Sequence, residues 1–353
     1  MTSASTYERP GTRGQRTEVI PFTAGDGLPL TVLHVTRTDG REPTRGPVLL
    51  VHGSGVRAES FRPPQPRTLV DALLDDGFDV WLVNWRASID HRPVAWTLDD
   101  AAAYDHPAVV RLILASTGAA TLKAFVHCQG STSFFMSALS GLVPEVTTIV
   151  SNAVSLHPVL PAWSRVKIGA LSPAIRRLTP VLSPRWGYHS EGAFSRGLRL
   201  VVRATHPECD NAVCNMVSFV YGSGHPALWS HRNLDDATHE WLRGEFAAAP
   251  MSFFWQMRAC VRAGHLVRTG DVPQIAEDLL GPPRTDARFV LLAGADNRCF
   301  LPASQQRSFD HFERHSPDRH TLHVLPGYGH LDLIFGSRAA QDVHPLIVDE
   351  LRH

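Results

Sequence analysis

Short apolar runs, separated by segments of helical periodicity, constrain the fold of this 353-residue chain more than any other feature. Pro47–Val51 is typical, because its residues are continuously apolar, as expected for a strand that is buried on both faces of a sheet. Strands that alternate with helices predict an α/β fold, with a mostly parallel sheet and helices on both of its faces. The other runs are Asp79–Asn84, Leu122–Val126, Val146–Val154, Ala287–Ala293 and Thr321–Leu325.

The same pattern predicts four parts along the chain. Residues 1–16 are polar and are expected to be disordered or extended. Residues 17–156 form the first part of the core, and residues 286–353 form its second part. Between them the strand pattern is lost, and residues 157–285 are predicted to be an inserted helical cap.

A hairpin is predicted at the start of the sheet. The strand candidates Thr17–Thr23 and Leu28–Thr36 flank the turn sequence Gly25-Asp26-Gly27, which predicts that the two strands are antiparallel. Tryptophans in the predicted cap are expected to pack between cap and core; these are Trp163, Trp186, Trp229 and Trp241. Helices are expected at about Arg67–Asp76, Leu98–Thr117, Ala162–Leu178, Glu208–Tyr221, Asp236–Ala248, Ser252–Ala263, Ala303–His315 and Gln341–Arg352.

Composition excludes several classes of partner. The formal net charge is zero, so no overall field favours nucleic acid or an anionic membrane. No apolar stretch is long enough to predict stable membrane insertion, and residues 1–15 lack the apolar segment of a signal peptide. Five cysteines in a chain of this length are no disulfide framework, so a cytoplasmic location is predicted. No phosphate-binding glycine loop is present, and no cofactor is predicted.

Cys128 occupies the position of a catalytic nucleophile. The strand Leu122–Val126 runs through His127 into Cys128, and a helix is expected from Gly130 onward. A sharp strand-to-helix turn of this kind, the nucleophile elbow, needs small residues two positions before and after the nucleophile. Gly130 satisfies the second requirement, whereas the branched Val126 departs from the first. Placing the nucleophile at Ser131 instead would move the hydroxyl into the helix, so Cys128 is the better candidate; an ordinary buried thiol is the alternative.

The remaining strand ends supply the partners of a thiol nucleophile. His330, in the turn Gly327-Tyr328-Gly329-His330, is the candidate base that takes the thiol proton. Asp296 follows the strand Ala287–Ala293 and is predicted to hold the His330 tautomer. The backbone N–H groups of Ser54, in the turn after Pro47–Val51, and of Gln129 are predicted to form the oxyanion hole.

Other residues compete for these roles. His127 is next to Cys128, but neighbours on a strand point to opposite faces, which argues against it as the base. Asp332 follows His330 closely and is expected to be a capping or loop acid. The other acids that could replace Asp296 are Asp271, Asp278 and Asp310, none of which directly follows a strong strand.

A group of cysteines and histidines in the predicted cap suggests metal ligation. His206, Cys209 and Cys214 have the spacing H-x2-C-x4-C, and His225 or His231 could complete a zinc site. The spacing departs from standard zinc modules, so ordinary packing is the preferred interpretation and no metal is predicted.

Together these residues resemble the α/β-hydrolase family from Thr17 to the C-terminus, except in the predicted cap. The segment His127–Met136 is similar to hydrolase domains fused to cholesterol-oxidase-like oxidoreductases, and His330–Gly336 resembles the histidine loop of acid lipases. Polyhydroxyalkanoate synthases are more distant relatives with a Cys-Asp-His triad and a similar Cys-Gln-Gly elbow. Val126 and Ser131 replace glycines of that family, which argues against polymer synthesis. The resemblance implies a lipid-like or sterol-like acyl substrate.

The sequence therefore predicts an acyl-transfer enzyme, most simply a hydrolase of an ester, thioester or lactone, that acts through an S-acyl intermediate on Cys128. Its expected partner is a small acyl substrate. Two alternatives stay open at this point. One is an acyltransferase or synthase that uses acyl thioesters, and the other is a catalytically silent ligand-binding protein of the same fold.

Overall fold

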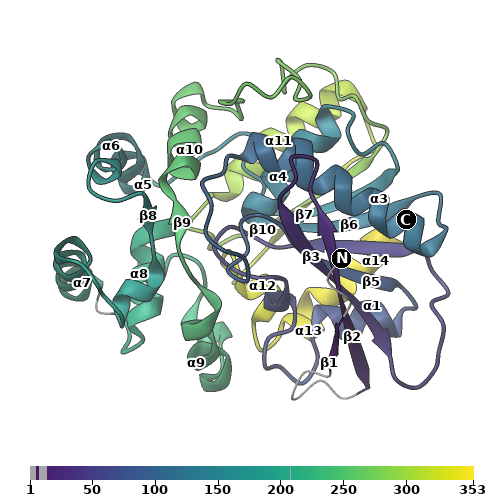
Figure 1. The fold of residues 1–353 in the computed structure, drawn as a ribbon, viewed down its shortest axis with the longest axis horizontal. Helices are drawn as coiled ribbons and strands as arrows, with labels where there is room; N and C mark the ends of the chain where they lie inside the picture. Colours follow the sequence, from purple (N-terminus) through teal and green to yellow (C-terminus); the bar gives the residue numbers. More distant parts are fainter. Residues whose placement is uncertain (1–4, 8–13, 207) are drawn as a thin grey trace.

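The computed structural model describes residues 5–7, 14–206 and 208–353 of the chain. Figure 1 shows a central sheet flanked by helices, with a largely helical group of elements at the left that extends beyond the sheet. The described part of the N-terminal segment is extended, since Ser5–Tyr7 pairs with Thr17–Val19. Of the segment predicted as residues 1–16, residues 1–4 and 8–13 lie outside the described residues, and Gln15 and Arg16 already belong to the next strand.

Within the described residues the main sheet has nine strands in the order β1-β2-β3-β5-β4-β6-β7-β10-β11. The first three pairings, β1–β2, β2–β3 and β3–β5, are antiparallel, and all later ones are parallel. The predicted hairpin and mostly parallel sheet are thus confirmed. The strands are β1 (Ser5–Tyr7), β2 (Gln15–Thr23), β3 (Pro29–Arg37), β4 (Pro47–Val51), β5 (Asp79–Asn84), β6 (Leu122–His127), β7 (Val146–Asn152), β10 (Arg288–Gly294) and β11 (Thr321–Leu325).

Both faces of the central strands β4, β5, β6 and β7 are buried, which explains their continuous apolar runs. In β4, Leu49 and Val51 enter one hydrophobic cluster, whereas Val48 and Leu50 enter the other. Helices α3 (His106–Thr117), α4 (Cys128–Leu139) and α11 (Pro302–His315) contribute side chains to the first cluster. Helices α1 (Leu69–Asp75) and α14 (His344–Arg352) contribute to the second. The arrangement is that of a sheet between two helical layers.

Several helices begin where the sequence places a cap. Thr68 and Thr97 each accept a hydrogen bond from the backbone three residues later, in capping boxes that start α1 and α2 (Leu98–Asp100). From α2 the chain continues without a break through a π-helical turn, η2 (Ala101–Asp105), into α3. The predicted helix Leu98–Thr117 is therefore confirmed. Shorter elements of the core are η1 (Ala58–Phe61), α12 (Asp332–Phe335) and α13 (Ala339–Asp342).

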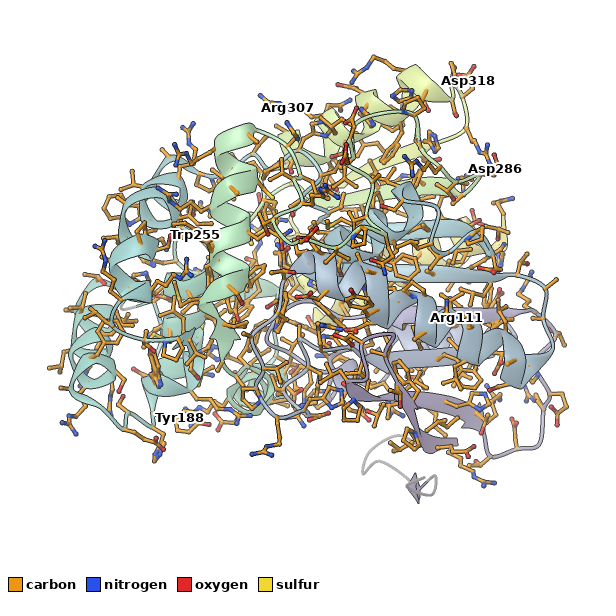
Figure 2. All side chains as sticks on the ribbon, turned by 45° about the horizontal axis from the view of Figure 1, so that its top comes forward. Arg111, Tyr188, Trp255, Asp286, Arg307 and Asp318 are labelled. Atoms are coloured by element: carbon orange, nitrogen blue, oxygen red, sulfur yellow. The ribbon has the colours of Figure 1, made fainter. Side chains whose placement is uncertain are left out.

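The segment between β7 and β10, residues 153–287, is hereafter called the insertion. It lies mainly at the left of Figure 1, and its labelled side chains Tyr188 and Trp255 are far from the sheet in Figure 2. The cap boundaries at residues 157 and 285 stay a prediction. The insertion contains α5 (Ala162–Val166), η3 (Lys167–Leu171), α6 (Ser172–Arg176), β8 (Val181–Leu182), η4 (Pro184–Gly187), α7 (Ala193–Thr205), α8 (Ala212–Tyr221), η5 (His231–Asn233), α9 (Asp236–Glu245), β9 (Ala249–Pro250) and α10 (Met251–Ala263).

The tryptophans of the insertion differ in their packing. Trp229 and Trp241 contact Phe335 of the core, with ring centroids 6.0 and 6.2 Å apart, as predicted. Trp186 packs on Phe194 inside the insertion instead. Trp163 is 60% exposed, so the prediction that it packs against the core is wrong. Among the helices of the described chain, none is both long and apolar enough to cross a membrane.

Candidate active site

The turn from β6 into α4 has the geometry of a nucleophile elbow. Cys128 has a φ angle of +54°, in the left-handed region that non-glycine residues rarely adopt. Gly130 permits the close approach of strand and helix, because an added Cβ would lie 2.2 Å from the carbonyl oxygen of His52 and 2.9 Å from Val51. Val126 is fully buried in the apolar cluster and pairs with Val51, so its side chain fits where the elbow usually has glycine.

His330 lies beside this turn. One of its ring nitrogens is within 4.8 Å of the Cys128 sulfur. The loop after β11 is held by backbone bonds, since the N–H groups of His330 and Leu331 donate to the carbonyl of Leu228 at 3.1 and 2.8 Å. The Nε2 atom of His330 is buried and makes no hydrogen bond to the described residues that meets ordinary geometry. The structure thus brings the predicted nucleophile and the predicted base together.

Asp296 does not reach His330. Its carboxylate is half exposed and accepts a hydrogen bond from Arg232 at 2.9 Å. The residue that contacts His330 is the next one, Asn297, whose Nδ2 lies 3.0 Å from the histidine Nδ1. The predicted contact between Asp296 and His330 is therefore wrong. The contact is displaced by one position in the turn after β10, and it is made by a neutral amide rather than a carboxylate.

The orientation of the Asn297 amide fixes the His330 tautomer. The backbone N–H groups of Cys299 and Phe300 donate to Asn297 Oδ1 at 2.9 and 3.2 Å, so that atom must be the oxygen. The NH₂ group consequently faces His330 and donates to Nδ1. A histidine that accepts at Nδ1 carries its proton on Nε2 when neutral. An aspartate here would accept from Nδ1–H and favour the opposite tautomer.

A second histidine, His127, also lies close to the Cys128 sulfur. A ring nitrogen of His127 lies within 4.8 Å of both the Cys128 sulfur and a nitrogen of His330, and the two imidazole rings are 4.9 Å apart. The prediction that His127 points to the opposite face is wrong, because Cys128 is left-handed and the alternation of an extended strand ends there. Burial, together with the neighbouring His330 and His52, holds the pKa of His127 well below its usual value.

Asn152 sets the tautomer of His127 in the same way. Its Nδ2 donates to the carbonyl oxygen of His330 at 3.0 Å and lies 3.1 Å from Nδ1 of His127. Since only the NH₂ group can donate to a carbonyl, His127 accepts at Nδ1 and carries its proton on Nε2. Each histidine beside Cys128 therefore has an amide donor at one nitrogen and a proton on the other.

Cys128 is surrounded by groups that stabilise its thiolate. The pKa of its thiol is held well below the usual value, chiefly because the Cys299 thiol donates a hydrogen bond to its sulfur. His330 and the backbone N–H of Gln129 act in the same direction, while burial acts against them. Cys128 is also the first residue of α4, where the helix dipole favours a negative charge. Cys299, which the sequence analysis missed, has its own thiol pKa raised by the nearby Cys128.

The predicted oxyanion donors Ser54 and Gln129 both line the cavity next to Cys128. Gly53 allows this approach, because an added Cβ would lie 3.1 Å from Cys128 Cβ. Whether their N–H groups bind an oxyanion stays a prediction. Two hydroxyls in this region, Ser54 Oγ and Tyr221 OH, are buried and have no hydrogen-bond partner in the described part of the chain. A bound ligand would give them one.

The cavity above Cys128 is large and mostly apolar. Its volume is about 1070 Å³, counted with the solvent at its mouth. Its floor contains Cys128, His127 and His330, and its walls are aliphatic and aromatic side chains of the insertion, among them Ile168, Ile175, Phe219, Phe253 and Met257. A concave apolar pocket with a few converging polar groups is the usual form of a small-molecule site.

The remaining candidate acids have other roles. Asp332 is buried and accepts hydrogen bonds from the backbone of Gly329 and Ser230 at 2.7 and 3.2 Å. It is a loop acid that shapes the turn containing His330, as predicted. Asp278 and Asp310 accept hydrogen bonds from Leu280 and Gln306, close to them in sequence. None of these acids contacts His330.

The strand order of the sheet and the elbow at Cys128 are those of a known fold, and solved structures have the same fold. A soluble variant of a monoglyceride lipase from Saccharomyces cerevisiae aligns with a TM-score of 0.62 at 14% identity, over 98% of this chain and 97% of that one. A thermophilic esterase from Thermogutta terrifontis aligns with a TM-score of 0.54 at 15% identity, over 95% and 98% of the two chains. The chain has the α/β-hydrolase fold.

Similar sequences are lipases and esterases. Sterol esterase 2 of Saccharomyces cerevisiae is 30% identical over 157 residues, which are 38% of this chain and 29% of that protein. Human lipase member K is 28% identical over 195 residues, or 51% and 48% of the two chains. Lysosomal acid lipase/cholesteryl ester hydrolase of Rattus norvegicus is 34% identical over 114 residues, or 28% of each chain. The chain thus spans less than half the length of these relatives, and no family model matches it.

Proposed function

We propose that this protein is an acyl-transfer enzyme that cleaves esters or thioesters of apolar, lipid-like acyl groups through an S-acyl-Cys128 intermediate. The observation that carries the proposal is the position of a thiol with a lowered pKa at the elbow, on the floor of an apolar cavity. The names of the similar proteins, a sterol esterase and several lipases, support an ester of a lipid-like acid as substrate.

In the proposed acylation step the Cys128 thiolate attacks the acyl carbonyl carbon. A carbon–sulfur bond forms, and the negative charge moves to the carbonyl oxygen, where the N–H groups of Ser54 and Gln129 would stabilise it. Each such donor contributes about 10²-fold or more to the rate. The tetrahedral intermediate then collapses, the bond to the alkoxide or thiolate leaving group breaks, and the acyl group remains on sulfur. Water completes the cycle by attacking the S-acyl carbonyl. The carbon–sulfur bond then breaks, the acyl group leaves as a carboxylic acid, and the second proton of water goes to the Cys128 sulfur or to solvent.

Asn297 affects both acylation and deacylation, because it determines which nitrogen of His330 carries the proton. With its proton on Nε2 and an amide donor at Nδ1, His330 can donate to the thiolate or to a leaving group, but it has no free lone pair to accept a proton from water. Acylation is therefore expected to outpace deacylation, and the S-acyl enzyme should accumulate. General base catalysis, which is worth about 10²–10⁴-fold, is the contribution that deacylation lacks.

The His330 tautomer with its proton on Nε2 also favours thioesters and aryl esters over alkyl esters as substrates. A leaving thiolate has a conjugate acid with a pKa of about 8.5 and can depart without a proton. An alkoxide requires protonation, which a neutral imidazole supplies poorly. Acyl transfer from a thioester donor is accordingly the second candidate function. A thiolate nucleophile also needs reducing conditions, so a cytoplasmic location remains part of the proposal.

The test is a comparison of wild-type protein with Cys128→Ala on a panel of acyl thioesters, aryl esters and alkyl esters of increasing chain length. We expect wild type to gain the mass of one acyl group, to show a burst of leaving group and to prefer thioesters and aryl esters. Cys128→Ala should lose the adduct and about 10⁴-fold or more of the activity. Cys260→Ala is the matched control, because that buried thiol lies in α10 and contacts the backbone of Val267.

Unchanged turnover in Cys128→Ala would eliminate Cys128 as the nucleophile. A wild-type protein that binds the acyl compounds but forms neither adduct nor product would instead be a catalytically silent binding protein, and the proposal would be wrong.

A further inference from the structure

A second group of cysteine and histidine side chains lies in the insertion. Cys209 precedes α8, Cys214 is in its first turn, His231 begins η5, and His239 is in the middle of α9. One potential ligand atom of each of these four residues lies within 4.8 Å of the corresponding atoms of the other three. Residues separated by up to 30 positions in sequence are thus brought to one point.

The distances fit tetrahedral coordination. Zinc binds thiolate sulfur at about 2.3 Å and imidazole nitrogen at about 2.0–2.1 Å, and a tetrahedral angle then separates the two ligand atoms by about 3.5 Å. Cys209 Sγ lies 3.6 Å from His239 Nε2, and Cys214 Sγ lies 3.4 Å from His231 Nε2. Two sulfur–nitrogen edges of the required tetrahedron are therefore already present.

The donor set is also balanced in charge. Two thiolates and two neutral imidazoles around Zn²⁺ give a complex with no net charge, which can be buried at low cost. The thiols are partly or fully buried, and amides of the same region position them. Asn215 donates to the Cys209 carbonyl at 3.1 Å, and Asn211 donates to the carbonyl of His239 at 2.8 Å. Such surrounding contacts commonly orient metal ligands.

We propose that Cys209, Cys214, His231 and His239 bind one Zn²⁺ in a closed, tetrahedral Cys₂His₂ site. The sequence analysis favoured packing for this region and named His206 and His225 as possible ligands. In the structure those two rings pack on each other with centroids 4.5 Å apart, and His239 takes the place that spacing could not reveal. With four protein ligands no position is left for water, so the metal is structural rather than catalytic.

The metal would stabilise the part of the insertion that is hydrogen-bonded to the loop containing His330. His231 is part of the segment 228–233, whose Leu228 carbonyl accepts from the backbone of His330. In the same segment, Asn233 donates to the carbonyl of Gly327 at 2.8 Å. At the other end of α8, the hydroxyl of Tyr221 lies close to Gly55 beside the active site. A metal that joins α8, η5 and α9 therefore stabilises both the wall of the cavity and the histidine loop.

The experiment measures metal in the full-length protein after purification without chelator and after titration with Zn²⁺. The background is Cys128→Ala, because His127, Cys128 and His330 also lie within 4.8 Å of one another and could bind added metal. We expect one equivalent of tightly bound zinc in this background and in the further variant Cys260→Ala, and none in Cys214→Ser. Replacement by Co²⁺ should give the intense visible absorption of a tetrahedral thiolate site.

His239→Gln keeps the test decisive if Cys214→Ser fails to fold, since His239 is only half-buried and its loss leaves both thiols in place. It should bind no zinc tightly and should lose the cobalt spectrum. Zinc or cobalt uptake equal in His239→Gln and in the Cys128→Ala background would overturn the proposal. So would a disulfide between Cys209 and Cys214, detected as an intact mass lower by two hydrogens and assigned by mapping the linked peptides. None of these readouts depends on acyl-transfer activity.

Discussion

The active site and the insertion each gather two cysteines and two histidines, yet their surroundings give them different chemistry. At the elbow, the neighbouring Cys299 thiol lowers the pKa of Cys128, and amides occupy Nδ1 of both histidines. Under the proposed function, that arrangement stabilises the thiolate of Cys128, which faces an apolar cavity. In the insertion, two sulfur and two nitrogen atoms converge within 4.8 Å of one another, with two sulfur–nitrogen distances of 3.6 and 3.4 Å. The two proposals therefore assign the same residue types to a nucleophile at the elbow and to a metal in the insertion, according to the neighbours that surround them.

The largest expected effect tests the claim that the elbow is built for a thiolate. Cys128→Ser should lose about 10⁴-fold of the turnover, because a serine hydroxyl requires a base and His330 beside Asn297 cannot act as one. The loss is measured as kcat/KM on a thioester and an aryl ester. The double variant Cys128→Ser, Asn297→Asp restores the usual tautomer and should recover a substantial part of the activity. If Cys128→Ser alone retained wild-type rates, the assigned tautomer would be incorrect.

A smaller but more diagnostic effect is expected from Asn297→Asp alone. The carboxylate would still accept from the backbone N–H groups of Cys299 and Phe300, so the turn should be preserved. Its second oxygen would accept from His330 Nδ1–H and free Nε2 to accept a proton. Deacylation should rise by about 10²-fold or more, and the burst should disappear. Rapid-mixing kinetics with intact-mass detection of the acyl adduct measure both quantities.

Asn297→Gln provides the control for that gain, because it keeps an amide and adds no charge. An equal increase in Asn297→Gln and Asn297→Asp would argue that relaxed packing, rather than the tautomer, limits deacylation.

The sequence predicted the parallel sheet, the elbow and the pairing of Cys128 with His330, because each depends on a local pattern of apolar runs and turn residues. It failed where side-chain direction depends on a single backbone angle. His127 was assigned to the opposite face by strand alternation, which ends at the left-handed Cys128. A charge criterion selects Asp296, whereas the turn after β10 directs the side chain of the next residue, Asn297, toward His330.

The insertion illustrates a second limit. Cys209 and Cys214 were visible as a pair, but His239 lies one helix further along the chain and has no spacing that connects it to them. Only the packing of α8 against α9 brings its imidazole to Cys209. Convergence of side chains from separate helices is a tertiary property, which sequence periodicity does not contain.

Cys299→Ala should produce a moderate effect that shows in the pH dependence of Cys128 alkylation. A thiol with an ordinary pKa of about 8.5 loses about tenfold in rate per pH unit below that value. In wild type the lowered pKa should keep the rate nearly constant down to lower pH. Removing the Cys299 donor raises the pKa of Cys128, so the rate should fall at pH 6–7 and remain unchanged near pH 9.

The alkylation is followed on the Cys128 peptide, and Cys299→Ser should lie between wild type and Cys299→Ala, because its hydroxyl still donates. Superimposable profiles for all three proteins would exclude Cys299 as the main cause of the lowered pKa.

The smallest effect on the reactivity of Cys128 is expected from loss of the proposed zinc ion. Removal of zinc, or the variant His239→Gln, should lower the midpoint of thermal unfolding by roughly 5–10 °C, because a ligand bound only by the folded state stabilises that state by mass action. The alkylation rate of Cys128 should change less than in Cys299→Ala, since the zinc would act on the active site indirectly, through the segment 228–233 and the end of α8. A loss of thiolate reactivity as large as that of Cys299→Ala, without a fall in the unfolding midpoint, would mean that the four residues of the insertion act on the nucleophile and not on the fold.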